Sequence, residues 1–197
     1  MNSTTDEPPS SGSEPAECDS GRLEPGGDGE EPGFQWPGDP ESVSPRCEIT
    51  NLHPRRRANL AILRQLVLRV LRAEGRTYQQ LDLVLLDEGA MRGYNRQYHA
   101  SDESTDHLGF QYDAPEGQVS GDIFVCLDDV ASQALEYGTS FHHELGKVVV
   151  HGVLHLCGWN DSTPARRKRM HAREEELLAA VPTGSPLGRW LGGGVNV

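Results

Sequence analysis

The spacing of apolar residues along the chain predicts a series of helices after residue 45. Leu60, Leu63 and Val67 recur every three or four positions, which places them on one face of an amphipathic helix. Pro54 suits the first turn of that helix and Gly75 suits its end. Further helices are predicted from Glu88 to Tyr98, from Asp128 to Tyr137, from Ser140 to Gly158, and from Pro164 to Ala180.

Short apolar segments predict strands at 47–51, 81–87, 107–112 and 119–127. The turn sequence DAPEGQ lies between the last two segments and predicts a hairpin. Helices combined with a few strands of mixed order predict an α+β fold, in which helices flank a small central mixed sheet of about four strands.

The first 45 residues differ in composition from the rest of the chain. They contain eleven of the 30 acidic residues but one of the 18 basic residues, and they are rich in Pro, Gly and Ser. Such a segment buries too little apolar surface to offset the entropy of ordering it, so we expect a disordered acidic tail at 1–45. The remainder has a net charge of −2, which leaves an anionic ligand possible. We place the domain at 46–181 and expect a flexible tail at 182–197.

No secretory signal, transit peptide or membrane-spanning run is visible, which predicts a cytoplasmic protein without a membrane partner. The four cysteines form no CxxC pair, so we expect free thiols in a reducing compartment.

The segment HGVLHLCGWND, from His151 to Asp161, carries the candidate chemistry. His151 and His155 lie one helical turn apart, so both imidazoles can reach one cation. The alternative is a histidine pair without a chemical role. Gly158 allows the chain to turn back, and Asp161 adds a third ligand, which fits a zinc site with an open position. Position 152 is glycine, where HExxH peptidases carry their general base, and this argues against such a peptidase.

Several blocks of the chain resemble the YbeY family of bacterial endoribonucleases and rRNA maturation factors. The family combines an HGxLHLxGYDH run with N-x-x-Y-R, P-T-D-V-L-S-F and G-D-I blocks. The corresponding segments here are YNRQYH (94–99), STDHLGF (104–110), GDIFV (121–125), QALEYGTS (133–140) and HGVLHLCGWND; Met170 and 174–176 match the closing helix. The resemblance covers about half of the chain, from Leu81 to Leu178.

The resemblance implies a fold in which the metal helix lines a cleft, with one Zn²⁺ per chain held by three side chains. It implies an endoribonuclease specific for single strands. The implied role is maturation of the 16S rRNA 3′ end and ribosome quality control. The implied partners are rRNA and the small ribosomal subunit, with a ribosomal protein or an assembly GTPase as a further candidate.

Two positions depart from the family pattern. The family's third ligand, a histidine, falls on Asp161. We expect Asp161 to bind the metal through oxygen, and the alternative is that it is a displaced copy of the neighbouring family aspartate. His99 replaces a family arginine thought to contact phosphate or help catalysis, so we take His99 as the candidate catalytic residue. The alternative is that His99 is an inert surface residue. Arg92 or Arg96 could then reach the cleft in its place.

A basic run formed by Arg166, Arg167, Lys168 and Arg169 follows the metal segment and is a candidate for RNA phosphate contacts. A solvated helix face is the commoner fate of such a run. Two other functions fit the same residues: a non-catalytic ribosome assembly factor in which zinc is mainly structural, and a metal hydrolase with another substrate.

Overall fold

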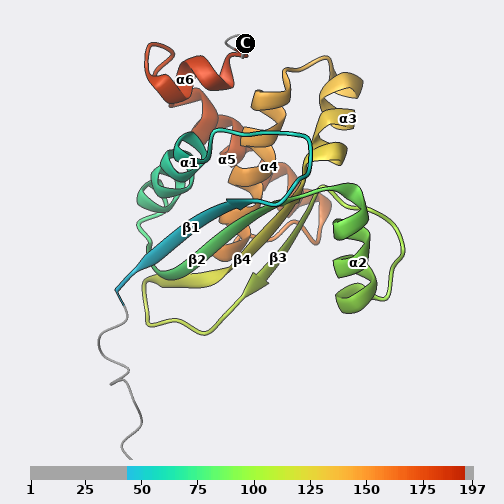
Figure 1. Ribbon diagram of the computed structural model, residues 1–197. Coiled ribbons are helices and arrows are strands. Elements are labelled where there is room, and N and C mark those ends of the chain that lie inside the picture. Colours follow the sequence, from blue (N-terminus) through green and yellow to red (C-terminus); the bar gives the residue numbers. More distant parts are fainter. Residues whose placement is uncertain (1–43, 194–197) are drawn as a thin grey trace, which may run out of the picture. The chain divides into compact units, whose positions relative to one another are not determined.

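The computed structural model describes residues 44–193, apart from the side chain of His99. The predicted acidic tail therefore lies outside the described residues, except for positions 44 and 45. The described part is built on one sheet of β1 (Arg46–Asn51), β2 (Thr77–Leu86), β3 (His107–Gln111) and β4 (Gln118–Cys126). The strand order is β1-β2-β4-β3, with β1, β2 and β4 parallel and β3 antiparallel to β4 (Figure 1). The predicted α+β fold with a four-stranded mixed sheet is confirmed, as is the hairpin.

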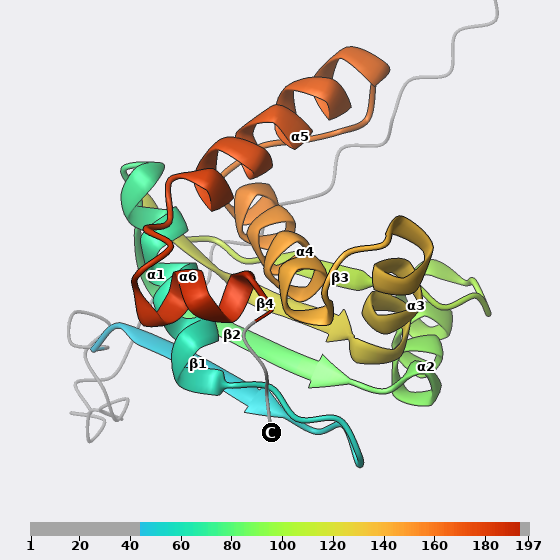
Figure 2. The same cartoon turned by 90° about the horizontal axis from the view of Figure 1, so that it is seen from above.

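Helices lie on both faces of this sheet. They are α1 (Leu60–Ala73), α2 (Glu88–His99), α3 (Leu127–Tyr137), α4 (Phe141–Leu156), α5 (Pro164–Ala179) and α6 (Pro186–Leu191). Helices α1 and α4 pack on one face, and α5 and α6 lie outside them (Figure 2). Within residues 44–193, no helix is both long and apolar enough to cross a membrane.

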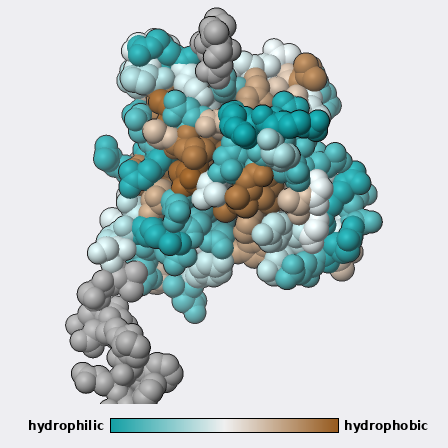
Figure 3. Space-filling view, in the orientation of Figure 1, coloured by the Kyte–Doolittle hydropathy of each residue, from teal (hydrophilic) through white to brown (hydrophobic). Residues whose placement is uncertain are grey.

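The main core lies between the sheet and helices α1 and α4. Alternate residues of the central strands, such as Leu83 and Ile123, point into this core and are fully buried. A smaller cluster lies under α2 and consists of Leu86, Met91, Leu108 and Cys126. In the view of Figure 3, hydrophobic surface gathers in the middle of the face and hydrophilic side chains surround it.

Two predicted helix starts are wrong. Helix α1 begins at Leu60 rather than near Pro54, because the Asn59 side chain caps it by accepting a hydrogen bond from the Ile62 N–H at 3.1 Å. Helix α3 begins at Leu127 with Cys126 as its N-cap residue, so Asp128 does not cap it.

The carboxylate of Asp128 instead connects three segments. Its Oδ1 lies 3.2 Å from Nε2 of the buried His53 and accepts from Nε of Arg56 at 3.0 Å. Its Oδ2 accepts from the backbone N–H of Glu88 at 3.2 Å, at the start of α2. Burial alone would raise the pKa of Asp128, but the hydrogen bonds from Arg56, Glu88 and His53 lower it to about 2.

The prediction of a flexible tail at 182–197 is wrong for residues 186–191, which form α6. Leu187, Trp190 and Leu191 are buried in the main core, where α6 contacts α1 and α4. Ser185 caps the helix by accepting a hydrogen bond from the Gly188 N–H at 3.0 Å. A short helix in a Gly-rich segment gains its stability from this burial rather than from its own propensity.

Helix α4 approaches the sheet closely where two glycines remove side chains. A Cβ at Gly152 would lie 2.8 Å from Cγ2 of Ile123, and a Cβ at Gly121 of β4 would lie 2.8 Å from Cδ2 of Leu156. Both distances are shorter than van der Waals contact between carbon atoms. The glycines therefore set the distance between α4 and the sheet.

We predict that Asp128→Asn lowers the free energy of unfolding by about 2 kcal/mol at pH 7. The folded-state pKa lies below the unfolded value of about 3.9, so the stabilisation is present above that value and is lost as the pH falls toward 2. Urea unfolding of both proteins between pH 2 and 7 measures the difference. Glu136→Gln, an exposed position on the same helix, is the control. A difference that does not change with pH would contradict the prediction.

We predict that Gly152→Val lowers the free energy of unfolding by about 3 kcal/mol, because its side chain would overlap Ile123. The matched control is Gly109→Val, since a Cβ at Gly109 meets no heavy atom within 4 Å. Equal midpoints of urea unfolding for the two variants would show that α4 is not held by this contact.

Candidate metal centre

The two histidines of the HGVLHLCGWND segment lie on the last two turns of α4. Ser140 caps this helix as predicted, accepting a hydrogen bond from the His143 N–H at 3.1 Å. The chain leaves the helix through Gly158, whose φ of +97° is a conformation that favours glycine. Nε2 of His151 lies 3.0 Å from Nε2 of His155. The predicted pair is therefore brought together with one ring nitrogen of each facing the other.

A third histidine, His107 at the start of β3, completes the cluster. One ring nitrogen of each of His107, His151 and His155 lies within 4.8 Å of those of the other two. The ring centroid of His107 lies 4.6 Å from that of His151 and 6.0 Å from that of His155. Sequence reasoning missed His107. The sequence feature that could have indicated His107 is the block STDHLGF. In this block, histidine stands where the corresponding P-T-D-V-L-S-F block has valine.

Hydrogen bonds orient the two imidazoles of α4. Nδ1 of His151 lies 2.6 Å from Oε1 of Glu174, a buried residue of α5. Nδ1 of His155 lies 3.0 Å from the backbone carbonyl oxygen of Trp159. Because both partners are acceptors, each Nδ1 carries the proton and each Nε2 keeps its lone pair for a ligand.

The imidazole of His107 is held in the same way. Its Nδ1 lies 2.8 Å from Oδ1 of Asp106, whose Oδ2 accepts a hydrogen bond from Nε2 of Gln133 at 3.0 Å. Burial alone would raise the pKa of Asp106, but the hydrogen bonds from His107 and Gln133 and the nearby His151 lower it to about 2. Asp106 is therefore an ionised acceptor for the His107 ring at neutral pH.

The environment also keeps His155 neutral. Burial, together with the neighbouring His151, lowers the pKa of His155 below its usual value. A neutral imidazole is the form that binds a metal, because protonation removes the lone pair.

The predicted third ligand, Asp161, lies on the loop after α4. Its Oδ1 is 3.9 Å from Nε2 of His155, and its side chain is 37% exposed. The structure therefore places a carboxylate beside the histidine cluster, and direct ligation by Asp161 stays a prediction.

His99, the predicted catalytic residue, is the last residue of α2, and its side chain lies outside the described part of the chain. Its role stays a prediction. The alternative cations are engaged elsewhere, since Arg92 pairs with Glu88 at 2.6 Å and Arg96 pairs with Asp102.

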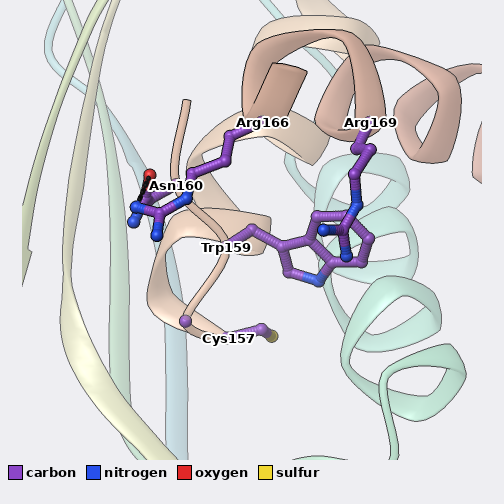
Figure 4. Close-up of a pocket in the computed structure, with 6 residues that line it drawn as sticks. Cys157, Trp159, Asn160, Arg166 and Arg169 are labelled. Atoms are coloured by element: carbon purple, nitrogen blue, oxygen red, sulfur yellow. Dashed lines mark hydrogen bonds between the residues drawn. The ribbon is translucent and has the colours of Figure 1, made fainter. Parts of the chain in front are cut away.

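The basic run separates into two pairs on α5. Arg166 and Arg169 line a hollow together with Trp159 and Asn160, and Figure 4 shows both arginines extending from α5 toward the loop that carries those residues. Arg167 and Lys168 line a different hollow.

Open space adjoins the histidine cluster on two sides. A cavity of about 200 Å³ is lined by His107, His151 and Lys147, among others. A second cavity, of about 500 Å³, is lined by His107 and His155. His107 lines both cavities, so a ligand in either one can approach the cluster.

The donor set fits a zinc ion. It offers three imidazole nitrogens, each oriented by an acceptor on its other nitrogen, with a carboxylate oxygen nearby. This combination of imidazole ligands and outer hydrogen bonds is typical of zinc sites in proteins.

The sequence comparisons with known proteins agree on one family. The family model described as Endoribonuclease YbeY matches residues 48–182. A protein named Endoribonuclease YbeY from Salinibacter ruber is 37% identical over 150 residues, which cover 72% of this chain and 95% of that protein. A protein of the same name from Carboxydothermus hydrogenoformans is 36% identical over 138 residues, which cover 68% of this chain and 96% of that protein. A solution structure of a Thermotoga maritima protein aligns with a TM-score of 0.47 at 24% identity, covering 68% of this chain and 90% of that one.

We predict that the purified protein binds one Zn²⁺ per chain and that His107→Ala and His151→Ala each reduce zinc content to well below one. Each variant removes one imidazole from a set of three. His143→Ala is the control, because His143 lies in the first turn of α4 and lines neither cavity beside the cluster. Zinc content is measured by inductively coupled plasma mass spectrometry after dialysis. Full zinc in His107→Ala would remove that residue from the ligand set.

Proposed function

Because the chain belongs to the Endoribonuclease YbeY family, we propose that it is a zinc-dependent endoribonuclease that cleaves phosphodiester bonds in single-stranded RNA. The observation that carries this proposal is the convergence of His107, His151 and His155 between two cavities. A zinc ion there would act as a Lewis acid toward a phosphoryl oxygen and would lower the pKa of water.

The protein's own groups prepare the site before any ligand arrives. Glu174 and the Trp159 carbonyl hold the Nδ1 protons of the α4 histidines, and Asp106 holds that of His107. The rings therefore need no reorientation to present Nε2, and preorganisation of this kind lowers the cost of reaching a charged transition state.

Asp161 would supply a fourth donor to the metal through Oδ1. It lies on a loop and is more exposed than the histidines, so it is the donor that can give way to an RNA phosphate. Its negative charge also makes the surroundings of the metal less positive than three histidines alone would, which weakens the Lewis acid.

The RNA would be held through its phosphates by Arg166 and Arg169, which share one hollow next to the Trp159 loop. His99 is proposed as a further phosphate-contacting or proton-transferring residue. The substrate we propose is the 3′ end of 16S rRNA in the small ribosomal subunit, which places the reaction in the cytoplasm and in ribosome quality control. A ribosomal protein or an assembly GTPase is the protein partner we propose.

A second function is favoured by the same donors. Three imidazoles and one carboxylate are enough to complete a tetrahedral zinc shell, which is the pattern of a structural site. In that case the protein would be a non-catalytic ribosome assembly factor that binds rRNA without cleaving it.

We predict that the zinc-loaded protein cleaves a single-stranded RNA that carries the 16S rRNA 3′ region, and that His151→Ala reduces the rate at least about a hundredfold while remaining folded. Product formation is followed by gel electrophoresis, with fully duplex RNA as the substrate control. Binding without cleavage by both proteins, together with retained association with the small subunit, would support the assembly factor and overturn the endoribonuclease.

A further inference from the structure

The cavity of about 500 Å³ beside His107 and His155 extends between the edge strand β3 and the end of α4. Gly109 and Gln111 contribute to one wall, and Leu156 and Trp159 contribute to the other. We refer to this cavity as the base pocket. It begins at the proposed metal ligands, so whatever occupies it lies next to the reacting bond.

Gly109 keeps the base pocket open. Alternation along β3 directs positions 107, 109 and 111 to the same face of the strand, which is the face toward α4. A Cβ at Gly109 meets no heavy atom within 4 Å, and its backbone does not have the positive φ that would require glycine. The missing side chain therefore serves neither close packing nor the backbone conformation, and its effect is to leave space.

The walls of the base pocket suit a planar group with polar edges. Leu156 offers apolar surface, and Trp159 and Asn160 of the loop after α4 complete the same wall. The exposed amide of Gln111 forms no side-chain hydrogen bond with any residue from 44 to 193, and Oδ1 of Asn160 accepts from Arg166 at 3.2 Å, which leaves Nδ2 of Asn160 as a donor. Apolar side chains against the face of a base, with amides at its polar edge, are how proteins hold a base that has left its stack.

The hollow of about 370 Å³ that contains Arg166 and Arg169 continues the base pocket, because Trp159 and Asn160 line both. We refer to it as the phosphate pocket. Among residues 44–193, the acceptors of the Arg166 side chain are neutral: Asn160 at 3.2 Å and Ser162 at 3.4 Å. Arg169 pairs with no carboxylate in the described part of the chain (Figure 4). Two guanidinium groups without carboxylate partners suit a phosphate.

We propose that these two pockets bind one nucleotide adjacent to the cleaved bond, with its base in the base pocket and its phosphate in the phosphate pocket. This inference rests on the proposed endoribonuclease function and adds a source of specificity. A base can enter the pocket only after it leaves its stack, so duplex RNA is excluded by the pocket rather than by the metal.

The competing occupant is an extended peptide. Strand β3 lies at the edge of the sheet, and an edge strand can bind a peptide through its backbone groups. Arg166 and Arg169 favour RNA over a peptide, because neither of them pairs with a carboxylate within residues 44–193 and both can therefore bind phosphate.

The test measures binding to the zinc-loaded full-length chain by fluorescence anisotropy, with a short phosphorothioate oligouridylate that resists cleavage and with its abasic counterpart. Gly109→Val fills the base pocket and should weaken binding of the oligouridylate about tenfold, because the base loses the space it would occupy. Binding of the abasic strand should be unaffected. Gln111→Ala, at an exposed position, should weaken only the oligouridylate, by about fivefold. Gly93→Val, at an exposed position of α2 with open space around it, is the control.

The phosphate pocket is tested separately. Arg169→Ala should weaken both strands and reduce the salt dependence of binding by about one phosphate contact. Arg189→Ala removes the same charge from an exposed position of α6 that lines neither pocket, and it should change neither.

Oligouridylate binding that is unchanged in both Gly109→Val and Gln111→Ala would overturn the inference. The proposed function would still stand if the parent protein cleaves RNA and His151→Ala does not. The competing occupant is tested with a labelled extended peptide of alternating valine and threonine. If the parent protein binds this peptide, and Gly109→Val loses that binding but keeps RNA binding, the pocket is a peptide site and the inference is overturned.

Discussion

The close packing of α4 across the sheet is the constraint on which the candidate centre depends. Gly152 faces Ile123, and Gly121 faces Leu156, at positions where even a Cβ would lie 2.8 Å from the opposite side chain. These contacts bring the last turns of α4 beside β3, so that His151 and His155 meet His107 from a different element. Gly152, which stands where HExxH peptidases have glutamate, is thus required by packing. The position has no room for a longer side chain.

Given that approach, hydrogen bonding determines what the three imidazoles can do. Each Nδ1 has an acceptor, and the acceptors come from α5, from the loop after α4 and from the residue before β3. The centre therefore depends on segments that are far apart in the chain. Trp159 connects the centre to α1, because its carbonyl oxygen accepts from His155 while its indole N–H donates to Glu74 at 2.9 Å. In our account, the loop that fixes the metal ligand also receives the RNA.

Local patterns allowed much of this to be predicted from the sequence. Helix α4, its Ser140 cap and its end near Gly158 follow from periodicity and capping, and the His151–His155 pair follows from helical spacing. His107 could not be derived in this way, because its proximity to His151, 44 residues later, depends on how an edge strand packs against a helix. Helix α6 was missed for a related reason. It is short and lies in a Gly-rich segment, and its stability comes from burying Trp190 and Leu191 against distant helices.

The central claim is that three histidines from two separate elements hold one zinc ion. X-ray absorption spectroscopy of the zinc-loaded protein tests this claim most directly. The account predicts a first shell of nitrogen and oxygen donors at about 2.0–2.1 Å, with outer-shell scattering that corresponds to three imidazole rings. Scattering from only two imidazoles, or a sulfur ligand at about 2.3 Å, would contradict it.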